Sequence, residues 1–217
     1  PNCVSIGYSA FQDCSKLEKI NLPKLTTIGY SAFQSTPLVE IELNSVTDLG
    51  GDSYDNGYQF SGCSKLTRAT FKSLTFIRKT MFINCGQLNY IDAPKVTSIG
   101  VSAFSGCSSF SNISFPIVNS ISSSAFSGIG SITELKSSTL NSISNNGFSS
   151  CQNLQIVDLP NCVSIGNSAF QGCSKLEKIN LPKLTTVGYS AFQSTSLVEI
   201  ELNSVTDLGG DSYDNGY

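Results

Sequence analysis

A phenylalanine that recurs at a nearly constant interval is the feature of this sequence that most constrains its fold. Nine phenylalanines align, and each ends a phrase related to Ile-Gly-x-x-Ala-Phe: Phe11, Phe33, Phe60, Phe82, Phe104, Phe126, Phe148, Phe170 and Phe192. Neighbours in this series are 22 residues apart, except for one interval of 27 residues. A short fixed period is typical of solenoids, in which each repeat forms one coil and buries its apolar side chains against the next. We therefore expect residues 1–217 to form a single solenoid.

The longer interval contains an insert, residues 51–59, that is rich in turn-forming residues and has no core pattern, so we expect a surface loop. A second period overlies the first, because residues 1–58 match residues 160–217 at all but four positions, an offset of 159 residues. A copy of the insert accordingly starts at residue 210. Solenoids need polar end coils and neither end resembles one, so we expect a fragment of a longer tandem array; a complete chain that associates end to end is the alternative.

Apolar residues recur at fixed distances after each phenylalanine. In the fourth coil they are Leu88, Ile91, Ala93, Val96 and Ile99. Ile91 and Ala93 alternate with polar neighbours, which predicts a half-buried strand, and stacked coils would join these strands into a parallel sheet. A proline follows the strand in several coils and ends it: Pro23, Pro94, Pro116, Pro160 and Pro182.

The Ile-Gly pair beyond this strand predicts a second apolar contact followed by a turn. We expect its glycine, for example Gly29, to supply a backbone angle that other residues resist. The Ser-Ala-Phe segment that follows is interpreted as a short helical turn that returns the chain, so that each coil closes a triangle-like loop.

The eight cysteines follow the repeat. Six lie three residues after a repeat phenylalanine: Cys14, Cys63, Cys85, Cys107, Cys151 and Cys173. Cys3 and Cys162 occupy a slot that holds leucine or valine in other coils. This placement favours small, buried apolar side chains over a disulfide framework. A metal site is the least favoured interpretation of the cysteines, because the chain has no histidine and no Cys-x-x-Cys pair.

Composition narrows the classes of function. Without histidine, catalytic triads of the Ser-His-Asp or Cys-His kind are excluded, and no phosphate-binding motif occurs. We expect neither an enzyme nor a cofactor. A net charge of −3 without basic runs argues against nucleic acid. No stretch is long and apolar enough to span a membrane. Charged residues make up only 13% of a chain rich in serine and asparagine, which favours an extracellular or cell-surface protein.

The outward positions that flank each buried strand residue vary from coil to coil while the core stays constant. They form the candidate binding face, for which we select Arg68, Tyr90, Asp92, Asn112, Glu134, Lys136 and Asp158. Arg68 and Tyr90 are the expected anchors, because arginine and tyrosine dominate binding energy at interfaces. The alternative is a merely solvated sheet face.

The insert also offers oxygen ligands before a glycine, at Asp52, Asp55 and Asn56. As a calcium loop the match is poor, since Tyr54 occupies a ligand position and Cys63 stands where a bidentate glutamate is needed. An ordinary turn-rich loop, or a lateral contact between arrays, explains the same residues.

The full repeat, Leu-x-x-Ile-x-Leu-Pro-x-Leu-x-x-Ile-Gly-x-x-Ala-Phe-x-x-Cys-x-x-Leu, resembles the BspA-like, Treponema pallidum-type leucine-rich repeat. Residues 17–33 and 176–192 follow it at nearly every fixed position, whereas Thr36, Thr195 and Ser137 depart from it. The resemblance implies a right-handed, curved leucine-rich-repeat solenoid of strand-dominated coils, found in surface proteins of oral and gut bacteria and of parasitic protists. It implies adhesion to host proteins or other cells.

Two functions therefore stand side by side. The first is a non-catalytic adhesion module that recognises a protein or glycan, such as one on a host surface, through the exposed sheet face. The second is a structural array whose near-identical units associate into an extracellular fibre or sheath.

Overall fold

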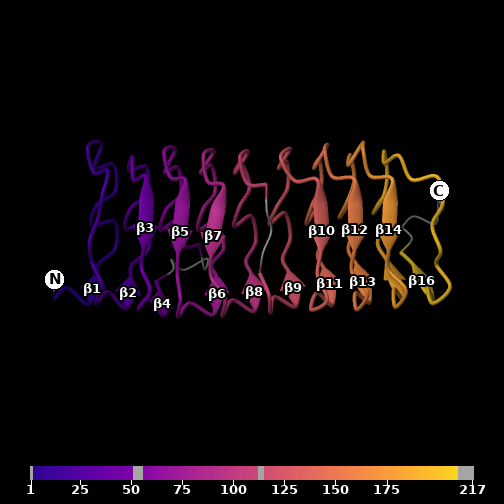
Figure 1. Cartoon of the computed structure of the whole chain (residues 1–217), viewed down its shortest axis with the longest axis horizontal. Coiled ribbons are helices and arrows are strands. Elements are labelled where there is room, and N and C mark those ends of the chain that lie inside the picture. The colour runs from indigo at the N-terminus through magenta and orange to yellow at the C-terminus, as the bar shows by residue number, and fades with distance from the viewer. Residues whose placement is uncertain (1, 51–55, 112–114, 210–217) are drawn as a thin grey trace.

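The computed structural model describes residues 2–50, 56–111 and 115–209. The coils stack side by side in chain order, so the first and last described coils lie at opposite ends of the stack (Figure 1). The described ranges hold sixteen strands of two or three residues and no helix, and hence no helix that could cross a membrane. The predicted strand-dominated solenoid is confirmed.

One row of the stack consists of three-residue strands. Two parallel sheets make up this row: β3 (Glu40–Glu42), β5 (Arg68–Thr70) and β7 (Tyr90–Asp92), and then β10 (Glu134–Lys136), β12 (Ile156–Asp158) and β14 (Lys178–Asn180). In β5 the central Ala69 is fully buried and Arg68 is exposed. The predicted period of two, with one buried residue between two outward ones, is confirmed.

A second row, visible below the first in Figure 1, consists of two-residue strands around the Ile-Gly phrase. It comprises β1 (Ser5–Ile6), β2 (Thr27–Ile28) and β4 (Asp48–Leu49) in one parallel sheet, and β6 (Phe76–Ile77), β8 (Ser98–Ile99), β9 (Ser120–Ile121), β11 (Ser142–Ile143), β13 (Ser164–Ile165), β15 (Thr186–Val187) and β16 (Asp207–Leu208) in another. The sequence indicated only an apolar contact and a turn here, because two residues are too short a run to show an alternation.

The insert is partly absorbed into the stack. Its residues 51–55 lie outside the described residues, but Gly57 accepts a hydrogen bond from the Ser31 amide and donates one to the Lys79 carbonyl. Gln59 is fully buried and its side-chain amide donates to the Gly50 carbonyl. Residues 56–59 are therefore part of a coil, and the prediction of a surface loop was wrong for them.

The return segment is a series of turns and not a helix. In one coil, Ser102 has a φ of 53°, and the Ala103 amide donates locally to the Gly100 carbonyl at 3.2 Å. The next amide, that of Phe104, instead donates to Ala125 in the following coil at 2.9 Å. Because alternate amides bond to a neighbouring coil, the segment cannot form the continuous intrachain ladder of a helix. The predicted helical turn is not present.

The Ile-Gly glycine has a different role from the one expected. Positive φ angles in the turns belong mostly to serine and asparagine, and Gly29 has none. A Cβ atom on Gly29 would instead lie 2.6 Å from the backbone carbon of Gly7 in the preceding coil. Glycine is needed because two backbones approach each other too closely for a side chain.

The nine repeat phenylalanines form one continuous column through the core. Neighbouring rings lie 5.1 to 5.7 Å apart between centroids and within 10° of parallel. Offset stacking of this kind stabilises aromatic pairs beyond the burial of their surface. Each ring in the interior of the stack is covered by rings from both adjacent coils, so no coil buries its own phenylalanine alone.

The cysteine slot lies beside this column. The Cys85 thiol donates a hydrogen bond to the Phe60 carbonyl at 3.0 Å, and the Cys107 thiol donates to the Phe82 carbonyl at 3.1 Å. Thr36, in the same slot, donates its hydroxyl to the Phe33 carbonyl at 2.8 Å. Cysteine thus fills a small apolar site and also adds a second hydrogen bond to a carbonyl that already accepts a backbone amide, a contact that the sequence pattern did not reveal.

All eight cysteines lie among the described residues, and each is a free thiol. Desolvation by burial raises the pKa of Cys107 and of Cys173 to about 12. Cys3 and Cys14 depart from the expected burial, because both lie in the first coil of the stack: Cys3 is exposed and Cys14 is half-buried. Their counterparts Cys162 and Cys173 are fully buried.

Candidate recognition face

The outward side chains of β3, β5 and β7 form a first patch, which we call the Arg68 patch. The strand register aligns Glu40, Arg68 and Tyr90 in one row across the three strands. A second row aligns Glu42, Thr70 and Asp92. The regular stacking of coils thus places side chains from three distant segments next to one another.

Arg68 and Tyr90 contact each other directly. The guanidinium carbon of Arg68 lies 4.5 Å from the centroid of the Tyr90 ring, and 41% of Tyr90 remains exposed. A cation over an aromatic face is attracted by the ring quadrupole, an effect of about 0.5–1 kcal/mol at an exposed site. The contact holds two long side chains in a defined arrangement before any partner arrives.

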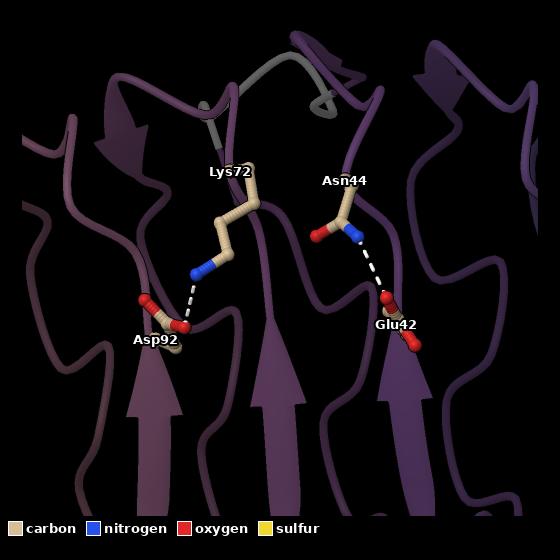
Figure 2. Close-up of polar contacts among 4 residues, drawn as sticks. All are labelled: Glu42, Asn44, Lys72 and Asp92. Atoms are coloured by element: carbon tan, nitrogen blue, oxygen red, sulfur yellow. Dashed lines mark hydrogen bonds and ion pairs between the residues drawn. The ribbon is translucent and has the colours of Figure 1, made fainter.

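Polar contacts fix the neighbouring row. Lys72, which follows β5, forms an ion pair with Asp92 on β7, as Figure 2 shows. Asn44, which follows β3, donates to Glu42 at 2.8 Å in the same view (Figure 2). The side chains of Lys72 and Asp92 are 49% and 28% exposed, so this pair adds little stability and mainly orients the two groups.

The outward side chains of β10, β12 and β14 form a second patch, the Lys136 patch. Lys136 donates to Glu134 on the same strand at 2.7 Å. The register places Lys136 beside Asp158, which accepts a hydrogen bond from Asn180 at 2.7 Å. Half-buried Ile156 lies between Glu134 and Lys178.

The structure therefore divides the predicted site residues into two groups. Arg68, Tyr90 and Asp92 come together in the first patch, and Glu134, Lys136 and Asp158 in the second. Asn112 lies outside the described residues. Sequence reasoning missed Lys72. This residue stands where several other coils have the proline that ends the strand, and the replacement of proline by lysine could have indicated it.

The charged groups of the face are exposed or half-buried, and most of them contact a neighbouring side chain. Within the described ranges, no three acidic, cysteine or histidine side chains are placed to hold a metal ion. Of the calcium candidates, Asp52 and Asp55 lie outside the described residues, and Asn56 forms a β-bridge with Lys79.

Two solved structures with similar folds have repeat architectures. A leucine-rich cell surface protein from Faecalibacterium prausnitzii is 22% identical with a TM-score of 0.55, and the match covers 84% of this chain and 58% of that one. The Treponema pallidum leucine-rich repeat protein is 19% identical with a TM-score of 0.56, covering 86% of this chain and 72% of that one. The chain thus spans a little over half of the Faecalibacterium protein. No curated protein matches it.

The family comparison covers the chain almost from end to end. The BspA type leucine rich repeat region matches residues 1–111, 56–155 and 97–216, in six copies. The repeat pattern, the stacked coils and this match agree, and the chain belongs to the BspA-type leucine-rich-repeat family.

Proposed function

We propose that this chain is a non-catalytic binding module that uses the strand face, with the Arg68 patch at its centre, to adhere to a protein or glycan. The observation that carries the proposal is the stacked pair of Arg68 and Tyr90, flanked by the Lys72–Asp92 ion pair. An exposed aromatic ring and a preorganised guanidinium are the side chains that most often anchor a binding interface.

The place of action proposed is the cell surface. The Faecalibacterium protein with the similar fold is described as a cell surface protein. The high content of serine and asparagine and the low content of charged residues in this chain fit the same location.

The test is an adhesion assay with beads that carry the whole chain. Wild-type beads, beads with Arg68→Ser and Tyr90→Ser together, and control beads with Lys183→Ser and Tyr189→Ser are applied to epithelial monolayers and to immobilised extracellular-matrix proteins. The control pair has the same charge change and an exposed tyrosine, but it flanks the two-residue strand β15. We expect only the Arg68 and Tyr90 variant to lose attachment. Equal attachment by all three would reject this face.

A structural array is the second candidate, and the repetition of most exposed residues favours it. Glu40 and Glu42 recur as Glu199 and Glu201, although an exposed position is free to vary when only the core must be kept. Seven coils at the strand spacing give an axial period of about 34 Å. Filaments with that period in negative-stain micrographs of the native protein would support self-association, and separate short rods would count against it.

A further inference from the structure

One coil departs from the repeat at a core position directly after its three-residue strand. The equivalent positions of other coils hold large or apolar residues that are buried: Leu43, Phe71, Ala93, Phe115, Leu159 and Leu181. In the coil of β10 this position is Ser137, which is half-buried. The coil also lacks the usual proline and has Ser138 instead.

The hydroxyl of Ser137 is used locally. It accepts hydrogen bonds from the backbone amides of Thr139 and Leu140, both at 3.2 Å, and so stabilises the turn that follows the strand. The side chain is too short to fill the space of a leucine. Phe115 in the preceding coil does not fill it either, since its ring is directed to Phe104, with centroids 6.0 Å apart.

An open pocket of about 340 Å³ lies beside Ser137 at the carboxyl end of β10. Buried apolar side chains contribute to its lining, among them Phe115, Val118, Leu135 and Leu140. Lys136, Ser137 and Thr139 contribute the polar part of the lining. The volume is at the small end of the range for ligand pockets, about 300–1,000 Å³.

Two observations define what the pocket accepts. Lys136 is the charged residue among those that line the pocket, and its ammonium group is already paired with Glu134, so the lining favours an uncharged group. Lys136 also belongs to the strand face, so the pocket and the surface proposed for binding share a residue. A polypeptide bound along that surface passes beside the pocket and can direct a side chain toward it.

We infer that the pocket beside Ser137 receives one large aliphatic side chain, of leucine size, from a polypeptide bound across the Lys136 patch. The inference rests on the proposed function, and it names the partner as a protein rather than a glycan. Other coils fill the equivalent position with a large apolar side chain of their own, and here the partner's side chain would take that place.

The experiment uses N-acetyl-leucinamide as the probe and follows methyl resonances of the whole chain by NMR. We expect saturable shifts of the Leu135, Leu140 and Val118 methyl groups. Ser137→Leu and Ser137→Phe introduce residues that the chain itself uses at this slot, and both should abolish the shifts. Ser137→Ala removes the two turn hydrogen bonds but leaves the pocket open, and should retain them.

Three results would overturn the inference: no shift of these methyl groups in the wild-type chain, equal shifts in Ser137→Leu, or tighter binding of hexanoate than of N-acetyl-leucinamide, which would indicate a fatty-acid site. The first result is measured on the wild-type chain alone, so it does not depend on whether a variant folds. The Arg68→Ser and Tyr90→Ser chain should bind the probe as the wild type does. Loss of bead attachment by that variant, with no probe binding in any chain, would reject the pocket and leave the face intact.

Discussion

The phenylalanine column makes a quantitative prediction about where the stability of the fold resides. Phe104 is fully buried, and its ring stacks on Phe82 at 5.5 Å and on Phe126 at 5.1 Å. Replacing it by alanine removes the burial of a whole aromatic side chain and leaves a cavity, at a cost of about 3–5 kcal/mol. Its stacked pairs with Phe82, Phe126 and Phe110 are lost as well, at about 0.5–1.5 kcal/mol each, so we expect a value near the upper end of that range.

Two further variants separate burial from stacking. Phe104→Leu keeps most of the apolar burial but loses all three stacked ring pairs, so the expected loss is about 1.5–4.5 kcal/mol. Phe192→Ala removes a ring that is only partly buried and stacks on Phe170 alone, so the loss should be about half that of Phe104→Ala.

The assay is urea unfolding followed by far-ultraviolet circular dichroism, together with amide hydrogen exchange. Repeat arrays can unfold in parts, so exchange rates show whether protection is lost first in the coils that touch Phe104. If Phe104→Ala and Phe192→Ala lower the unfolding free energy equally, the column does not act as a continuous core and the reasoning fails.

The thiols and the glycines give further predictions. At pH 8 a thiol-specific reagent should modify exposed Cys3 rapidly but Cys107 only after unfolding, and equal rates would contradict the burial. Because the pKa of Cys107 is raised from 9.0 to about 12 in the folded chain, its contribution to stability is complete below pH 9 and is lost between pH 9 and 12. Cys107→Val should therefore show a shallower decline of the unfolding free energy over that interval. Gly29→Ala should destabilise the chain by about 1–3 kcal/mol, since its Cβ would meet backbone atoms at 2.6 Å. Gly7→Ala, with nothing within 4 Å of the added carbon, should be close to neutral. Thermal melts of the two glycine variants make this comparison.

The parts of the fold that were predictable are those in which a side chain type repeats. The aligned phenylalanines fixed the coil register, and the alternation around Ile91 predicted β7 and the burial of its centre. The outward placement of Arg68 and Tyr90 followed from the same alternation, because a strand with one buried face must expose the other.

The parts that were not predictable depend on contacts between coils. The alternating bonds of Ala103 and Phe104 replace a helical turn by a ladder to the next coil, and no local pattern encodes that choice. The close approach at Gly29 and the thiol bond of Cys107 likewise involve atoms of another coil. Lys72 reaches Asp92 only because β5 and β7 are neighbours. The pocket beside Ser137 depends on the direction in which the Phe115 side chain of the preceding coil points.

The parallel strands have a mechanical consequence. Their hydrogen bonds run along the axis of the stack, for example between β9, β11 and β13, so a pulling force on the two chain ends acts along these bonds. The force loads one coil boundary after another rather than all strands together. Each coil that detaches would release its 22 residues, roughly 75 Å of extended chain. A chain of this kind would lengthen stepwise under tension, as an extensible tether does, while the coils that remain stacked keep their shape.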